Sequence, residues 1–221
     1  MKKPPKVFLD ANVFKFATTE QLRLVQRKTT INWGRTTSDT VVHDLKILNP
    51  HERIRNPKLK EEASLVDKVA EEIKSGRITA VTHFEVAFET MGLPAMDCER
   101  GRFYGAPVDQ VDGPVKYSRL IISARHDTEQ LLRDFLEKIS HPRFDELQKI
   151  TGAYQGAYEK NLNQMLDAFY VWCAEFERCD YFLTLDFSLI RMISSAPKRP
   201  KHLKMVTPSV LLKDLSNEER A

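Results

Sequence analysis

Short, almost continuous apolar runs alternate along the chain with longer stretches in which apolar residues recur every three or four positions. The runs at 6–10, 77–82, 181–185 and 204–207 are typical of buried strands. The longer stretches predict helices at 12–27 (with a break near Thr18), 60–75, 83–91, 127–139 and 161–178, and after Pro208. Strands that are apolar throughout and alternate with helices indicate a parallel sheet covered on both faces. The predicted fold class is therefore α/β.

Two regions interrupt this alternation. Residues 29–60 are polar with short β-branched patches, which predicts an irregular insertion with room for a hairpin. Residues 93–117 are rich in glycine and proline and predict a long loop. This loop begins a second insertion, residues 92–160, which is largely helical. Because the chain has no internal repeat, we expect a single domain over residues 1–221.

Composition narrows the functional classes. The chain is 42% hydrophobic and 29% charged, which is ordinary for a soluble globular protein. Its apolar runs are too short for a membrane-spanning helix or a signal peptide, so we expect a cytoplasmic protein without a membrane partner. Three cysteines without a CxxC pair predict neither a disulfide framework nor a zinc site, but reduced and largely buried thiols. The net charge of +3 does not by itself indicate nucleic acid.

Four acidic residues stand after the predicted strands or on the neighbouring helices: Asp10, Glu85, Asp167 and Asp186. Helix capping or turn chemistry explains each of them alone. Together they would converge on the edge of the sheet where the strands end and ligands bind. Two carboxylates about 4 Å apart repel by roughly 4 kcal/mol, which a cation or raised pKa values would relieve. All-oxygen ligands favour Mg²⁺ or Mn²⁺, so the sequence predicts a site for one or two such ions.

Four stretches of the chain resemble, in order, the motifs of the PIN-domain nucleases, a family that includes the VapC-type toxins of toxin–antitoxin pairs. The stretches are KVFLDANVF (6–14), ITAVTHFEV (78–86), DAFYVWCAEFERCDYFLTLDFSL (167–189) and KMVTPSVLL (204–212). The resemblance implies a PIN-like three-layer fold, in which helices flank a central, mainly parallel sheet of about four to five strands.

The resemblance also implies roles for single residues. Metal ligands are predicted at Asp10, Glu85, Asp167 and Asp186. Asn12 and Thr184 are predicted to orient these carboxylates. Glu89 lies one helical turn beyond Glu85 and is either an additional or substitute ligand, or a solvent-facing acid.

The function implied by the resemblance is that of a divalent-metal-dependent endonuclease that hydrolyses phosphodiester bonds. RNA is the preferred substrate, and DNA is left open. The insertions at 29–60 and 92–160 exceed the plan of the minimal toxins, so an antitoxin or other protein partner and a homodimer also stay open. The alternative is a catalytically silent PIN-fold module that binds nucleic acid or protein. A HAD-type phosphatase would need a second aspartate in place of Asn12, and a dinucleotide-binding enzyme a glycine-rich turn there.

Basic residues outside the acidic set are candidates for nucleic-acid binding. In the second insertion, cations are mixed with aromatic residues that could stack on bases. Residues 191–204 hold six basic or histidine side chains and no acid. The candidates are Arg102, Tyr104, Lys116, Arg119, Arg191, Lys198, Arg199 and Lys201. Ordinary solvation of a surface loop is the alternative.

Overall fold

Five parallel strands form the central sheet of the protein. The structure is a computed structural model that describes residues 3–18, 21–34, 36–48, 50–90, 102–116, 125–153 and 161–218. The strand order is β5-β4-β1-β6-β7. The strands are β1 (Lys6–Leu9), β4 (Thr79–His83), β5 (Val108–Val111), β6 (Tyr181–Leu183) and β7 (Lys204–Val206). The predicted α/β class with a parallel central sheet is confirmed.

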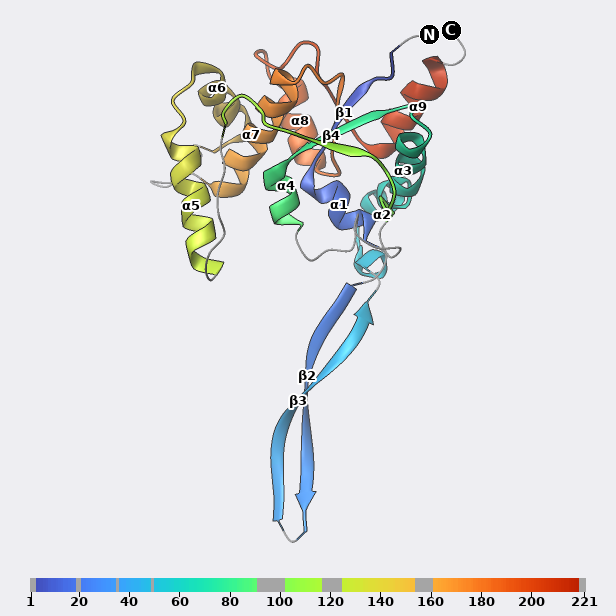
Figure 1. Ribbon diagram of the computed structural model, residues 1–221, viewed down its shortest axis with the longest axis vertical. Coiled ribbons are helices and arrows are strands. Elements are labelled where there is room, and N and C mark those ends of the chain that lie inside the picture. Colours follow the sequence, from blue (N-terminus) through green and yellow to red (C-terminus); the bar gives the residue numbers. More distant parts are fainter. Residues whose placement is uncertain are drawn as a thin grey trace.

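Helices flank this sheet and complete a three-layer fold (Figure 1). They are α1 (Ala11–Ala17), α2 (Pro57–Ser64), α3 (Val66–Lys74), α4 (Phe84–Glu89), α5 (Arg125–Lys138), α6 (Pro142–Thr151), α7 (Leu162–Phe176), α8 (Phe187–Ser195) and α9 (Pro208–Glu218), with a 3₁₀ turn at Pro50–Arg53. α3 packs against α9, while α6 packs against α7 and α8. None of the helices in the described parts of the chain is long and apolar enough to span a membrane.

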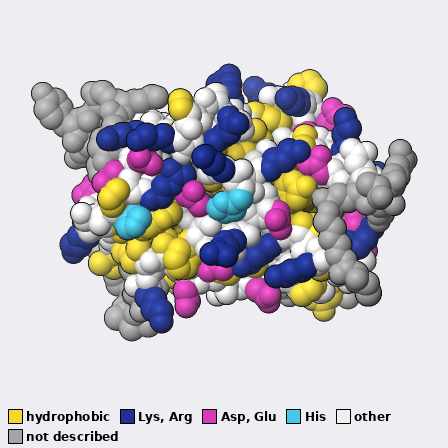
Figure 2. Space-filling view, turned by 90° about the horizontal axis from the view of Figure 1, so that it is seen from above, with side chains coloured by type: hydrophobic (Ala, Val, Ile, Leu, Met, Phe, Trp, Pro, Cys, Tyr) yellow, Lys and Arg dark blue, Asp and Glu magenta, His cyan; other side chains and the backbone are white. Residues whose placement is uncertain are grey.

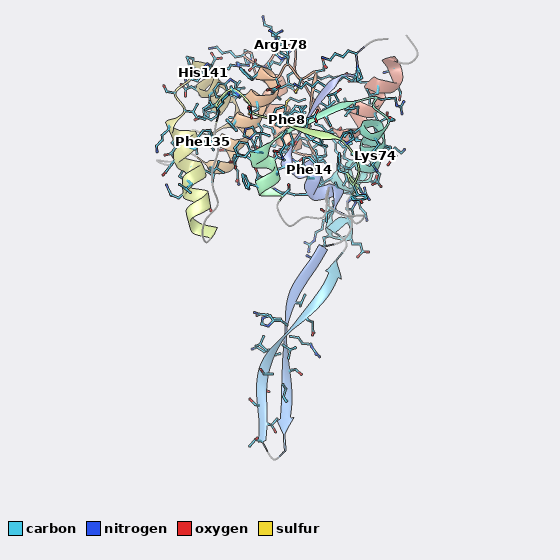
Figure 3. All side chains as sticks on the ribbon, viewed as in Figure 1. Phe8, Phe14, Lys74, Phe135, His141 and Arg178 are labelled. Carbon is cyan, nitrogen blue, oxygen red and sulfur yellow. The ribbon has the colours of Figure 1, made fainter. Side chains whose placement is uncertain are left out.

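β1 lies in the middle of the sheet, and this buried position explains why its sequence is apolar. Val7, Phe8 and Leu9 have no exposed surface, because strands lie on both sides of β1 and helices cover it. Phe8 lies in the middle of the body (Figure 3). Its ring stacks on Phe182 with ring centres 5.3 Å apart and also contacts Tyr170 of α7. Burying one such side chain contributes roughly 2–3 kcal/mol. The first polar residue after this buried run is Asp10, so the strand fixes the position of that carboxylate.

The strand order creates a crevice at the carboxyl ends of β1 and β6. From β1 the chain adds β4 and β5 on one side, and later β6 and β7 on the other. The helices that follow β1 and β6 therefore diverge, and ligands bind at such a point of reversal. Asp10 follows β1 here, and Asp186 begins α8 after β6.

A long antiparallel hairpin replaces the second half of the first predicted helix. α1 ends at Ala17, and residues 21–48 form β2 (Gln21–Trp33) and β3 (Thr36–Leu48), which project away from the body (Figure 1). The prediction of a helix up to residue 27 is therefore wrong for residues 21–27. The hairpin that the sequence left open within 29–60 is present, but it starts earlier and is regular. Pairing with β3 decides the conformation of β2, and no local pattern reports that pairing.

Smaller differences concern breaks and short elements. The predicted helix 60–75 is two helices, α2 and α3, with a break at Leu65. The predicted loop 93–117 contains β5, and the polar segment after residue 139 contains α6. Cys173 and Cys179 are buried free thiols, as predicted. Cys98 and Arg119 lie outside the described residues, as do parts of both predicted insertions.

Candidate functional site

The two aspartates after β1 and β6 each cap the helix that follows. The Oδ1 atom of Asp10 accepts a hydrogen bond from the Ala11 amide at 2.7 Å. The Oδ1 atom of Asp186 accepts from the amides of Ser188 and Leu189 at 2.8 and 3.0 Å. Capping, the alternative role that the sequence offered for these acids, is therefore real. It also holds both carboxylates at the edge of the sheet.

Thr184 connects the two strand ends through its hydroxyl group. Its Oγ1 atom donates to Oδ2 of Asp10 at 2.7 Å and accepts from Nδ2 of Asn12 at 2.9 Å and from the Asp186 amide at 3.0 Å. The Leu185 amide donates to Oδ1 of Asn12 at 2.9 Å. Thr184 is fully buried, so these bonds are shielded from water. The two residues predicted to orient the carboxylates thus form one network, in which Thr184 contacts Asp10 directly and Asn12 acts through Thr184.

A cavity of about 220 Å³ opens beside this network. α1, α4, α7 and the turn before α8 contribute its walls, and the lining residues are Asp10, Ala11, Asn12, Lys15, Glu89, Asn163, Leu166, Asp167, Tyr170 and Asp186. The structure therefore brings together three of the four acids predicted as ligands: Asp10, Asp167 and Asp186. The fourth carboxylate in the cavity is Glu89.

The two glutamates of α4 differ in their surroundings. Glu85 is fully buried in the first turn of α4, where its amide donates to Nδ1 of His83 at 3.2 Å. It does not line the cavity. Glu89 lies in the last turn of α4, where its Oε1 atom accepts a hydrogen bond from the Tyr170 hydroxyl at 2.5 Å. Its Oε2 atom is 3.4 Å from Nζ of Lys15. Glu89, which the sequence offered as a substitute for Glu85, is thus held against the other acids.

Burial and mutual repulsion raise the pKa of two of these carboxyl groups. Burial raises the pKa of Asp167 to about 8, and the charges of Asp10, Asp186 and Glu89 contribute to the rise. Burial also raises the pKa of Asp10 to about 6, although the hydrogen bonds from Thr184 and Ala11 oppose this. Two perturbed carboxyl groups in one cavity are a feature of functional sites. They show that the negative charges here are incompletely compensated.

The lining residues suit a hard divalent cation. Four carboxylates and the Asn12 amide supply oxygen atoms, which Mg²⁺ and Mn²⁺ prefer. Among the lining residues, Lys15 alone carries a positive charge. Within the described ranges, no three acidic, His or Cys side chains are grouped tightly enough to hold an ion as they stand. The donor chemistry and the raised pKa values fit a metal ion, and the side chains would have to close around it.

Those of the basic residues predicted to bind nucleic acid that the structure describes do not line this cavity. Arg102 pairs with Asp67 at 2.8 Å, and Lys198 pairs with Glu146 at 2.6 Å. The connection 196–203 precedes β7, so its basic residues lie at the opposite edge of the sheet from Asp10. Figure 2 shows the face of the body opposite to the hairpin, where Lys and Arg are scattered among Asp and Glu. Tyr104, Lys116, Arg191 and Lys201 are exposed.

Three polar lining residues were missed from the sequence: Lys15, Asn163 and Tyr170. Helical spacing was a usable signal for all of them. Lys15 lies three residues after Asn12 on α1, and Tyr170 lies three residues after Asp167 on α7. Residues at this spacing share one face of a helix, so a predicted ligand on a helix also indicates its neighbours in the site.

Comparisons with known proteins add no relative to this geometry. No model of a protein family, no curated protein and no solved structure matches the chain. The resemblance to the PIN-domain nucleases therefore rests on the order and local sequence of its motifs. The function has to be argued from the cavity itself.

Proposed function

We propose that the protein is a metal-dependent endonuclease of the PIN type that hydrolyses phosphodiester bonds in RNA. The observation that carries the proposal is the cavity in which Asp10, Glu89, Asp167 and Asp186 meet. Burial and repulsion raise the pKa of Asp10 and Asp167, and capping of α1 accounts for the place of Asp10 but not for that of Asp167. A divalent cation would relieve the repulsion, so binding such an ion is a chemical role that accounts for the cluster.

The lining residues indicate water as the nucleophile. They include no Ser, Cys or His, and the Tyr170 hydroxyl is donated to Glu89. A bound Mg²⁺ or Mn²⁺ supplies Lewis acidity for the phosphate and for the attacking water. Asp10, Glu89, Asp167 and Asp186 would hold one or two such ions. Thr184 keeps the Asp10 carboxylate in one orientation, and Lys15, which lines the cavity beside Glu89, would offer its charge to a phosphate oxygen.

Cleavage assays with and without metal test this function. We expect the purified protein to cut a 30-nucleotide single-stranded RNA in Mg²⁺ or Mn²⁺, and EDTA to abolish cleavage. A DNA strand of the same sequence measures the preference for RNA. If the protein binds RNA but cleaves neither strand in either metal, the proposal fails and the catalytically silent module takes its place.

The two glutamates of α4 provide a matched pair for the site assignment. We expect Glu89→Gln to weaken Mn²⁺ binding and slow cleavage by at least about tenfold, because Glu89 lines the cavity. Glu85→Gln should leave the Mn²⁺ affinity within about twofold. Isothermal titration with Mn²⁺ measures both variants without relying on cleavage. The opposite ranking would return the assignment to Glu85.

The sequence also leads us to predict four further properties. They are the cytoplasmic location, the choice of RNA over DNA, an antitoxin or other protein partner, and a homodimer. The first assay addresses only the choice of nucleic acid.

A further inference from the structure

The hairpin formed by β2 and β3, residues 21–48, is a free-standing arm. Its strands pair in one unbroken antiparallel register from Gln21↔Leu48 to Trp33↔Thr36, and Gly34 lies in the turn with a φ of 60°. Within the described part of the chain, β2 and β3 pack extensively only against each other, and the arm extends well away from the body (Figure 1). Thirteen residues per strand correspond to roughly 40 Å.

The body of the protein provides little packing for the described part of the arm. Between residues 25 and 44, all side chains that the structure describes are exposed or only partly buried, and they extend into solvent on both faces of the ribbon (Figure 3). An isolated two-stranded hairpin is marginally stable in water and gains no core here. A surface of this size, whose described side chains pack little against their own protein, is suited to binding another molecule.

The arm carries the surplus positive charge of the chain. Its sequence holds five Lys or Arg and two Asp, a surplus of three, which equals the net charge of +3 for the whole protein. Both acids are engaged within the arm. Asp44 pairs with Arg27 at 3.0 Å, and Asp39 accepts a hydrogen bond from Thr30 at 2.8 Å. Lys28 is exposed on the opposite face from Arg27. Among the described side chains of the arm, Lys28 thus presents its cation to solvent, while both acids already have partners within the arm.

The exposed side chains that the structure describes on the arm are mostly polar. Five threonines stand on its two strands: Thr29, Thr30, Thr36, Thr37 and Thr40. Among the side chains described, Val41 is the one large apolar residue of the arm that is well exposed, at 47%. Stable dimer interfaces need an apolar centre, which this part of the arm lacks. Hydroxyl groups and cations are instead the side chains that contact phosphate and sugar.

The arm is also connected directly to the cavity. Seven-residue α1 joins β1 to the region of β2, and α1 carries Asn12 and Lys15, both of which line the cavity. The carboxyl edge of the sheet, where α1 and α4 begin, is on the side of the body from which the arm extends (Figure 1). An RNA strand bound in the cavity would therefore lie on the side of the body from which the arm extends.

We propose that the arm binds the sugar-phosphate backbone of the RNA substrate at a distance from the cleaved bond. The proposal rests on the nuclease function proposed above and adds how a substrate is selected. Long RNAs reach both the cavity and the arm, whereas RNAs of a few nucleotides reach only the cavity. Because the contacts are to the backbone, the arm adds affinity without adding sequence preference.

An arm-shortened protein tests the proposal. Leu24 and Leu45 are register partners, so residues 25–44 can be replaced by an Asn-Gly turn that closes the same ladder. Binding of a fluorescent 30-nucleotide RNA is measured by anisotropy in EDTA, so that the readout does not depend on cleavage. We expect a Kd at least tenfold higher than that of the full chain and a weaker dependence on salt. Circular dichroism confirms that the shortened protein is folded.

Two point variants and a short substrate sharpen the result. Lys28→Ala should reduce the slope of log K against log salt by about 0.7, the value for one phosphate contact to a single strand. Lys213→Ala, which removes an exposed cation from α9 outside both the arm and the cavity, should leave RNA affinity unchanged. Cleavage of a six-nucleotide RNA should be the same with and without the arm.

Each contrary outcome has a definite meaning. Unchanged affinity and salt dependence in the shortened protein would overturn the proposal for the arm, even if cleavage stands. If light scattering shows that the full chain is a dimer and the shortened protein a monomer, while the RNA affinity is unchanged, the proposal is overturned, because the arm then binds a second copy of the chain. If the full chain binds the 30-nucleotide RNA through the arm but does not cleave it in Mg²⁺ or Mn²⁺, only the nuclease assignment fails.

Discussion

The Asp10→Asn protein is expected to fold normally and to lose nearly all nuclease activity. Asparagine keeps the shape of Asp10 and its capping of α1, but it removes the charge that would bind a cation. We expect the cleavage rate of the 30-nucleotide RNA to fall by a factor on the order of 10² to 10³, the scale for removing one group that stabilises charge during reaction. Single-turnover assays with saturating protein measure the chemical step directly.

Asp109→Asn is the matched control for this substitution. Asp109 is exposed on β5 and does not line the cavity, so the same chemical change there should leave the rate within about twofold. Thr184→Val keeps the shape of the buried side chain and removes the hydrogen bond to Asp10. It should slow cleavage by about 10- to 100-fold, as expected for a residue that orients a ligand. Wild-type activity in Asp10→Asn would rule out this cavity as the catalytic site.

Without metal, the Asp167→Asn protein should be more stable than the wild type, and increasingly so as the pH rises. The pKa of Asp167 in the folded protein is about 8, above its ordinary value of 3.8. A raised pKa means that the folded state holds its proton more tightly than the unfolded chain. This contribution to stability is complete below pH 3.8 and is lost as the pH rises through 8. The neutral amide of asparagine avoids that loss.

The difference in the free energy of unfolding should be near zero at pH 4 and on the order of 3 kcal/mol at pH 8.5, because each pKa unit corresponds to about 1.4 kcal/mol and relaxation reduces the full effect. Urea unfolding in EDTA at several pH values measures it. Adding 10 mM Mg²⁺ at pH 8.5 should stabilise the wild type and leave the variant nearly unaffected. A difference in the free energy of unfolding that does not depend on pH would show that the pKa of Asp167 is not raised in the folded protein. Asp109→Asn again serves as the control.

The sheet and most of its acidic edge could be predicted because both depend on local sequence. A central parallel strand is mostly apolar or β-branched, so KVFL, TAVTH and YFL can each be recognised as buried strands from their own sequence. An acid directly after such a strand can only lie at its carboxyl end, and this located Asp10 and Asp186. β5 was missed because its sequence, VDQV, is short and carries exposed polar residues at the edge of the sheet.

The choice between Glu85 and Glu89 could not be made from spacing. The two lie one turn apart on the same helix, and α4 is only six residues long. Which glutamate reaches the cavity depends on how far α4 extends beyond the sheet and on the Tyr170 hydroxyl that meets it from α7. Both are contacts between segments distant in sequence. The hairpin was missed for the same reason, since residues 21–27 contain apolar positions that also suit a helix, and only β3 makes them a strand.

The central place of β1 determines when the site can exist during synthesis. β1 is made first, but its neighbour β6 begins at Tyr181, and Thr184 meets Asp10 across 174 residues of sequence. The arm, by contrast, can pair as soon as residue 48 is available. During synthesis the arm could therefore form long before the residues of the proposed site come together. The carboxylate of Asp10 is therefore held in place only after residue 184 has been made, long after the arm can pair.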